Sequence, residues 1–422
     1  MRTLVMPLGL AAALLSPAAF AQNAATTPLP AAQAARQIAE PAGRLTLEDA
    51  LALAAGRNFT LSAAGHELDA AEGGIMQART IPNPEVAVLF EDNRRDTRTT
   101  TAQVNLPLEL GGKRSARIDA AGKARELAQS QLGATRTDLR AAVVGGFFAV
   151  VIAQERVKLA RGSADIAAKG ALAAARRVAA GKIAPLEESK ARVEQANAEL
   201  EVADAEAALA AARQALAGLW GSSEARFLEA AGNLDTLPAR PDGATLTQAL
   251  DSAPELANSR LEMERRQAII GVERSRQYPD LTVSLGSKRD NSSDRGTMPV
   301  LGVSLPLPLF DRNQGNLYAA MRQADKAADE YRATQVRLAN ELQQAARQLT
   351  VSRTSAEALK GTVLPAAQQA YEAATRGFEA GKFNFLDVLD AQRTWFQARI
   401  RYLGVVATAY QAATTIDRIL GR

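Results

Sequence analysis

The sequence contains no cysteine and only one histidine, His66, among 422 residues. Without cysteine the chain can form no disulfide, thiolate metal site or thiol nucleophile, and it can carry no lipid on an N-terminal cysteine. One histidine excludes histidine metal clusters and most histidine-dependent triads within one chain. We therefore expect no metal site and no catalytic residue, and we interpret His66 as an exposed or half-buried residue of an early helix.

Aromatic residues are also scarce, at 5% of the chain, and the 47% hydrophobic fraction is carried largely by alanine. This composition suits long helices that pack closely along their sides better than it suits a compact globular core. The charges nearly balance, with 50 Lys and Arg against 46 Asp and Glu. No basic patch is interleaved with aromatics, so we expect no nucleic-acid partner.

The sequence also lacks the motifs of enzymes and nucleotide-binding proteins. We find no nucleophile motif and no metal-ligand cluster, and the glycines at Gly111 and Gly112 before Lys113 lack the spacing of a phosphate-binding loop. We therefore predict that the protein is not an enzyme and holds no cofactor.

The N-terminus has the pattern of an export signal, assigned to residues 1–21. Arg2 precedes an apolar stretch at 4–15, and a small-x-small site ending at Ala21 predicts cleavage before Gln22. Residues 22–44, rich in Ala, Pro and Gln, are expected to form an extended arm. No later stretch reaches 18 consecutive apolar residues, so any membrane span is expected to consist of strands.

The chain repeats one plan at a spacing of about 200 residues. We predict a first repeat over 45–230, a linker over 231–244 and a second repeat over 245–422. Four short segments recur in the same order: 45–51 (LTLEDAL) as 244–250 (ATLTQAL), Ile81-Pro82 as Tyr278-Pro279, 106–110 (LPLEL) as 305–309 (LPLPL), and Arg176 with Gly181-Lys182 as Arg376 with Gly381-Lys382.

Each repeat is expected to contain the same elements in the same order. In the first, a helix over 47–79 begins after Thr46 as its N-cap and ends before Pro82 and Pro84. Alternation of apolar and polar residues then predicts hairpin strands at about 84–92 and 101–108, and in the second repeat at about 279–287 and 298–307.

A pair of long helical stretches follows each hairpin. The first stretch of each pair runs over about 113–176 and 316–375, and at 1.5 Å per residue it would reach on the order of 90 Å. The second stretches show apolar residues every seven positions, such as Leu186, Val193 and Leu200. This spacing predicts helices packed along their length as coiled coils. The fold class is therefore mostly α with a small β part.

Four strands with one apolar face cannot close a barrel in lipid, where an unpaired edge is costly. Several chains must then share one barrel, and three chains would supply twelve strands. The strands are consistent with a trimer but do not prove it.

The order of helix, hairpin and long helix pair, repeated twice behind a signal, resembles the TolC-like outer-membrane factors over essentially the whole mature chain. The segments LELGGKR at 108–114 and PLPLFDRNQGN at 306–316 are similar to its cobalt–zinc–cadmium branch. The resemblance implies a homotrimer in the Gram-negative outer membrane, a twelve-stranded barrel continued by a helical coiled-coil tunnel across the periplasm, and a passive exit duct for heavy-metal cations. It also implies a periplasmic membrane-fusion adaptor and an inner-membrane proton-driven transporter as partners.

The resemblance further implies two functional sites. The helix-to-helix turns would form the tips that dock onto the adaptor, through Gly181, Lys182, Ile183, Leu186, Gly381, Lys382, Phe383 and Leu386. Asp387 and Asp390, three residues apart on one helix face, match the carboxylate ring at the tunnel mouth. The alternatives are a plain helical hairpin for the tips, and a solvated face or a first-turn acid pair favoured by the helix dipole for the two aspartates.

Other classes of function stay open. An outer-membrane factor for drugs or other small molecules fits the same pattern, because the sequence has no obvious soft-metal relay. A periplasmic coiled-coil scaffold explains the heptads and the signal but not the two hairpins. Apolipoprotein-like lipid binding would need amphipathic helices without strands.

Overall fold

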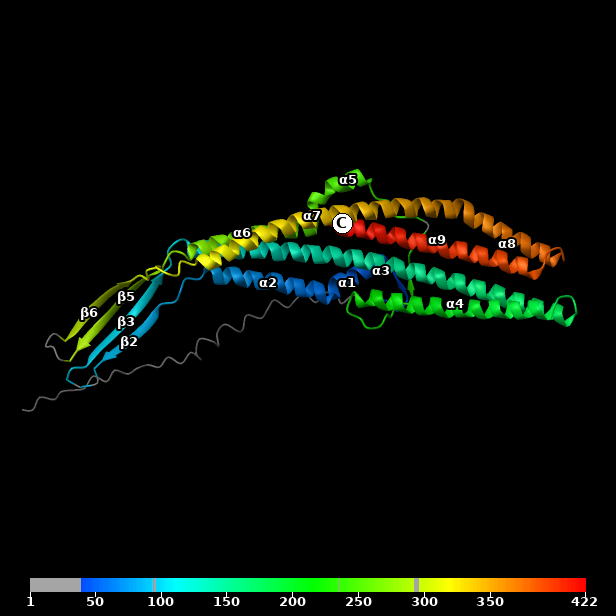
Figure 1. Cartoon of the computed structure of the whole chain (residues 1–422). Helices are drawn as coiled ribbons and strands as arrows, with labels where there is room; N and C mark the ends of the chain where they lie inside the picture. The colour runs from blue at the N-terminus through cyan, green and yellow to red at the C-terminus, as the bar shows by residue number, and fades with distance from the viewer. Residues whose placement is uncertain (1–38, 93, 95, 235, 292–295) are drawn as a thin grey trace, which may run out of the picture. The chain divides into compact units, whose positions relative to one another are not determined.

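The computed structural model describes residues 39–422 apart from positions 93, 95, 235 and 292–295 (Figure 1). The expected signal sequence, its cleavage site between Ala21 and Gln22, and most of the expected arm lie outside the described residues. Helices dominate, and the strands are few.

The first helical segment begins as its sequence indicates. Thr46 caps helix α1 (Leu47–Arg57) in a capping box with Asp49. The prediction of one helix over 47–79 is wrong, because Asn58 adopts an extended conformation and α2 (Phe59–Arg79) starts after it. The Asn58 side chain accepts a hydrogen bond from the Leu61 amide at 2.7 Å and donates one to the Leu219 carbonyl at 2.8 Å. Asn58 therefore caps α2 while binding a distant loop.

The four hairpin strands form one antiparallel sheet in the order β2 (Glu85–Glu91), β3 (Thr99–Leu108), β5 (Leu281–Asp290) and β6 (Thr297–Ser304). The β3–β5 pair joins the two hairpins, with Leu108 opposite Leu281. β6 ends three residues before the expected position 307, since Pro306 and Pro308 have no N–H to donate to a neighbouring strand. All four connections to helices lie at the same end of the sheet.

The two faces of this sheet differ in chemistry. Val86, Val104, Leu285 and Leu301 pair across the four strands as one exposed apolar row. The adjacent row contains Leu106, Val283 and Val303 on the same face. The opposite face is polar, and there the Ser284 hydroxyl donates to the Asn105 side chain at 2.7 Å. The sheet is therefore amphipathic, and no other part of the described chain covers its apolar face.

The long helices differ from the expected pair in one place. α3 (Lys113–Ala179) is a continuous helix of 67 residues, about 100 Å long at 1.5 Å per residue, and α4 (Pro185–Gly218) packs along it. In the second half the expected helix over 316–375 is interrupted. α7 (Gln314–Ala358) passes through a π-helical turn (Leu359–Val363) into α8 (Leu364–Glu379), because Pro365 cannot donate a helical hydrogen bond. α9 (Phe385–Leu420) then returns along α8 and α7 (Figure 1).

Two apolar cores hold the helices together. The first gathers Leu45, Leu53, Phe147 and Leu216 from the N-terminal elements. The second contains Leu256, Leu338, Leu342 and Ile416, contributed by α6 (Pro254–Ser275), α7 and α9. A short helix, α5 (Gly243–Gln248), starts inside the expected linker because Asp242 caps it.

The end of the expected arm is packed rather than free. β1 (Arg44–Leu45) pairs in parallel with β4 (Glu229–Ala230). The Glu40 carboxylate accepts hydrogen bonds from the Trp220 indole at 3.1 Å and the Arg226 amide at 2.6 Å. These bonds fasten the chain to the loop after α4 before the first helix begins.

One helix in the described part of the chain, α3, contains a window long and apolar enough to cross a membrane by composition. Only 33% of that window is buried, but a single such helix is weak evidence, because core helices of soluble proteins pass the same test. α3 packs against α2, α4, α6 and α9, which accounts for its apolar positions.

The first core predicts where the helical part is most sensitive to truncation. Phe147 is 1% exposed, so Phe147→Ala should lower the free energy of unfolding by about 3–5 kcal/mol. Leu200→Ala, at an exposed position of α4, should change it by less than about 1 kcal/mol. Denaturant titration followed by far-ultraviolet circular dichroism measures both. Equal shifts would contradict this assignment of the core.

Candidate functional site

The two helix-to-helix turns have the same backbone design at an offset of 200 residues. Gly181 has φ +67° and Gly381 φ +71°, the left-handed conformation that glycine adopts without a Cβ clash. The Lys182 amide donates to the Arg177 carbonyl at 2.8 Å, and the Lys382 amide to the Gly377 carbonyl at 2.8 Å. Both turns are therefore Schellman-type helix ends, as glycine followed by lysine suggests.

The side chains expected at the tips are mostly exposed. In the first turn Lys182 and Leu186 are exposed, while Ile183 packs against the core between the hairpins. In the second turn Lys382 is exposed, Leu386 is half-buried and Phe383 is 50% exposed.

Phe383 lies directly over Gly377. A Cβ atom at position 377 would come within 2.1 Å of the Phe383 ring. The first turn has Arg177 at the matching position, and there the residue that corresponds to Phe383 is Ile183. The missing side chain at 377 therefore makes room for an aromatic ring in one tip only.

Asp387 has a structural role within the single chain. Its carboxylate accepts a hydrogen bond from the backbone N–H of Asn384 at 3.1 Å, and the side-chain oxygen of Asn384 accepts one from the backbone N–H of Asp387 at 3.0 Å. This reciprocal pair is a capping box for α9. Asp390 lies about one turn further along and is exposed, like Asp387. At the equivalent positions of α4, an acid and a base replace the two acids, and Glu187 and Lys190 form an ion pair at 3.4 Å.

The helical hairpin formed by α3 and α4 contacts the helical hairpin formed by α8 and α9 just behind the tips. The Arg177 guanidinium of α3 lies 3.7 Å from the centre of the Phe378 ring of α8, and it also donates to the Phe378 carbonyl at 3.3 Å. Ala174, Ala191 and Val388 form a small apolar core beside this contact.

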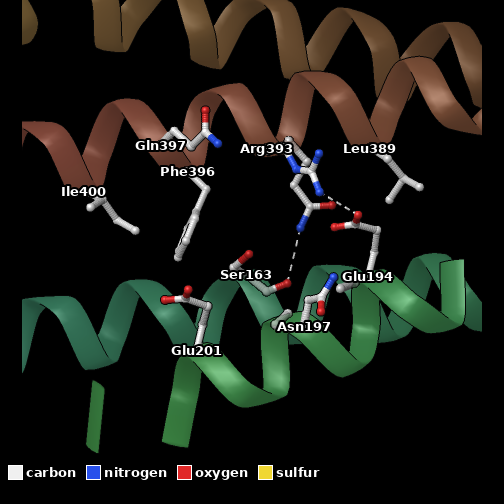
Figure 2. Close-up of a pocket in the computed structure, with 12 residues that line it drawn as sticks. Ser163, Glu194, Asn197, Glu201, Leu389, Arg393, Phe396, Gln397 and Ile400 are labelled. Atoms are coloured by element: carbon white, nitrogen blue, oxygen red, sulfur yellow. Dashed lines mark hydrogen bonds and ion pairs between the residues drawn. The ribbon is translucent and has the colours of Figure 1, made fainter. Parts of the chain in front are cut away.

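A second contact between the hairpins borders a cavity of about 250 Å³ (Figure 2). Arg393 of α9 pairs with Glu194 of α4 at 2.7 Å, and the Gln392 amide donates to the Ser163 carbonyl of α3 at 3.3 Å. Phe396 points from α9 toward α3 and α4.

These contacts between the two helical hairpins are not recognisable from the sequence, because the partners lie 199–229 positions apart and form no motif. One feature of the sequence could have indicated the Glu194–Arg393 ion pair. Glu194 and Arg393 occupy nearly equivalent positions of the two repeats and carry opposite charge.

Among the residues that the structure describes, no group of three or more His, Asp or Glu side chains is arranged to hold a metal ion. His66 lies on the exposed surface of α2 with Asp69 3.8 Å away. Neither the tips nor the aspartates thus form a closed coordination site within one chain.

An amphipathic hairpin sheet connected at one end to very long paired helices is the design of a TolC-like outer-membrane channel. Solved structures share this fold. A membrane protein of Pseudomonas aeruginosa aligns with a TM-score of 0.78 at 21% identity, covering 89% of this chain and 92% of the other. CusC, described as forming a transmembrane channel, aligns with a TM-score of 0.75 at 19% identity, covering 89% and 91%.

Sequence comparison gives the family. The profile of the outer membrane efflux protein family matches residues 50–222 and 245–422, and the chain belongs to this family. It is 64% identical to the cobalt-zinc-cadmium resistance protein CzcC of Cupriavidus metallidurans over the full length of both chains. The nickel and cobalt resistance protein CnrC of the same organism is 34% identical, covering 69% of each. The protein is thus an outer-membrane efflux channel component of the heavy-metal resistance branch, as the resemblance implied.

Proposed function

We propose that three copies of this chain form a passive exit duct from the periplasm to the outside. The observation that carries the proposal is the four-stranded sheet, which has one exposed apolar face, one polar face and two edges, β2 and β6, that pair with no other described strand. An apolar face can contact lipid, and a polar face can line water. The unpaired edges require further strands, because backbone groups in hydrocarbon have no water to bond.

The edges favour closure by copies of the same chain. β2 and β6 run antiparallel to each other in the strand order, so the β2 strand of a second copy can continue the sheet beyond β6 with the same alternation. Two copies would give an eight-stranded barrel, which is narrow enough for side chains to fill its interior. Three copies would give twelve, with more room for a passage. The long helices would then form the periplasmic tunnel, and the N-terminal 21 residues would direct export.

The partners follow from the tips. We infer that the two Schellman turns dock onto a periplasmic membrane-fusion adaptor, with Phe383, Leu386, Ile183 and Leu186 as apolar contacts and the two lysines beside them. The adaptor would connect the duct to an inner-membrane proton-driven transporter. No catalytic step belongs to this function.

The proposed cargo is heavy-metal cations, since the full-length relative is a cobalt-zinc-cadmium resistance protein. The alternative is efflux of other small molecules, which the pyoverdine export protein OpmQ of Pseudomonas aeruginosa supports more weakly, at 27% identity over 44% of this chain. A susceptibility profile of a deletion strain against metals and drugs distinguishes them. A soluble periplasmic scaffold would not need the uncovered apolar face.

The proposed gate is Asp387 and Asp390. Six carboxylates from three copies would attract cations strongly at the tunnel mouth. At the equivalent positions of the first helical hairpin, Glu187 forms an ion pair with Lys190, so we assign the gate to the second helical hairpin.

The barrel proposal predicts intolerance of charge on one face only. Val283→Arg and Val88→Arg place a guanidinium on the apolar face and should cost about 2–4 kcal/mol each near the bilayer midplane. Thr282→Arg is the matched control, because Thr282 neighbours Val283 on the same strand but lies on the polar face. The yield of heat-stable oligomer on unboiled gels is the measurement. Equal yields for all three variants would rule out the barrel.

The tip proposal predicts loss of docking without loss of assembly. Gly381→Pro is incompatible with φ +71°, and Phe383→Asp places a carboxylate in an apolar contact. Crosslinking to the adaptor should fall about tenfold or more while oligomer yield stays unchanged. Ala203→Asp, at an exposed position of α4 outside both the tips and the apolar stripe of Leu186, Val193 and Leu200, should leave crosslinking intact. Unchanged crosslinking in both tip variants would place the docking surface elsewhere.

The gate proposal predicts that divalent or trivalent cations added on the periplasmic side block conductance in planar bilayers. Asparagine is the informative substitution, because Asp387→Asn removes the charge but keeps an oxygen that can accept from the Asn384 amide. Asp387→Asn with Asp390→Asn should weaken the block about tenfold or more and reduce cation preference.

Glu187→Gln serves as the control for the gate and should conduct and block like the parent. Parental block in the double asparagine variant would mean that the two aspartates are an ordinary solvated helix face.

A further inference from the structure

The four connections between the sheet and the helices share a pattern that the proposed duct does not explain. Each combines an exposed apolar side chain with a basic residue a few positions away. The pairs are Ile81 with Arg79, Leu110 with Arg114, Tyr278 with Arg276, and Phe310 with Arg312. Because all four connections lie at one end of the sheet, these residues form a collar there, which we call the junction collar.

The apolar side chains of the junction collar are largely exposed and are not packed against the rest of the described chain. Ile81 is 72% exposed and Phe310 91%. Residues 305–310 follow β6 as Leu-Pro-Leu-Pro-Leu-Phe, with Leu307 and Leu309 also exposed. This segment carries a large apolar surface but belongs to no helix or strand.

Acids also lie in or beside these connections, among them Glu85, Glu109 and Asp311, but three of the four arginines of the junction collar are not paired with any of them. Arg276 pairs with Glu273, and Lys113 with Asp280 at 2.7 Å. Within the described chain, Arg79, Arg114 and Arg312 have no carboxylate at ion-pair distance.

Arg114 is held in place by other means. Its guanidinium donates two hydrogen bonds to the Arg79 carbonyl, at 3.0 and 2.8 Å. These bonds fix the position of the charge without neutralising it, so the guanidinium can still attract an anion.

The place of the junction collar follows from the sheet. The last apolar row, Leu108 opposite Leu281, lies directly before it. At about 3.3 Å per residue, Leu110 lies roughly 7 Å beyond Leu108, at the boundary of the apolar band, and Arg114 follows in the first turn of α3. Residues 305–310 leave β6 at the same end of the sheet and lead to Arg312. In a membrane this is the level of the lipid headgroups.

We propose that the junction collar binds anionic phospholipids of the adjoining leaflet, with Arg79, Arg114 and Arg312 on the phosphates and Phe310 and Leu309 among the upper acyl carbons. Guanidinium groups bind phosphate through paired, charge-assisted hydrogen bonds, and aromatic rings favour the interface between hydrocarbon and water. The inference rests on the proposed membrane-spanning sheet. It adds a specific ligand class, since an uncharged barrel rim would accept any lipid.

The test uses the full-length protein in nanodiscs of equal phosphatidylglycerol and phosphatidylcholine, with a spin label on one lipid at a time. Electron paramagnetic resonance measures the fraction of each lipid that is motionally restricted. The parent should restrict phosphatidylglycerol in clear excess. In the triple variant Arg79→Gln, Arg114→Gln, Arg312→Gln this preference should fall about tenfold or more.

The matched control is Arg136→Gln, Arg140→Gln, Arg401→Gln, which removes three exposed helical arginines that also have no carboxylate at ion-pair distance in the described chain. It should keep the parental preference. Retention of the preference in the junction-collar variant would overturn the proposal. Loss of the parent's preference for phosphatidylglycerol on adding millimolar inorganic phosphate would also overturn it, because the site would then bind any phosphate. Loss of oligomer in the junction-collar variant alone would show that the arginines contact a neighbouring copy, and would also overturn it.

Conductance separates this inference from the proposed duct. A parent that conducts in planar bilayers but shows no lipid preference overturns the lipid site alone. A parent that neither inserts nor conducts overturns both.

Discussion

The demand of backbone N–H and C=O groups for partners constrains this molecule more than any single side-chain contact. Within the four-stranded sheet, neighbouring strands pair their backbone groups, but the outer edges of β2 and β6 have no partner strand in the part of the chain that the structure describes. In water such edges would be solvated, whereas in hydrocarbon each unpaired group costs several kcal/mol. The apolar face therefore makes sense only if the edges close on further strands. In the proposed duct, further copies of the same chain would supply those strands.

Much of this architecture is readable from the chain. Alternation located the four strands to within a few residues, Thr46 indicated the first cap, and the repeated Gly-Lys pairs at 181 and 381 marked the two helix-to-helix turns. These features depend on neighbouring residues, which the sequence contains directly.

Features that depend on distant residues were not predictable. Asn58 breaks the first helix because its side chain also binds the Leu219 carbonyl, 161 positions away. The Arg177–Phe378 and Glu194–Arg393 contacts require knowledge of how two hairpins lie together. The spacing of Asp387 and Asp390 predicts that they share a helix face, but the role of Asp387 in the α9 capping box depends on a side-chain geometry that residue spacing alone leaves open.

The π-helical turn at Leu359–Val363 has a consequence for the direction in which the second tip faces. A π-turn accommodates one extra residue, and each residue of an α-helix turns the chain by about 100°. Side chains of α8 are therefore rotated by about that angle relative to the pattern of α7. α7 packs on α6 and α9, while α8 contributes Ala374 and Phe378 to the core near the tips. Deletion of one residue in this turn would rotate the aromatic side of α8 away from Arg177, although no residue of the tip had changed. The orientation of the second tip about the helix axis thus depends on the number of residues in the π-helical turn, some twenty residues before Gly381.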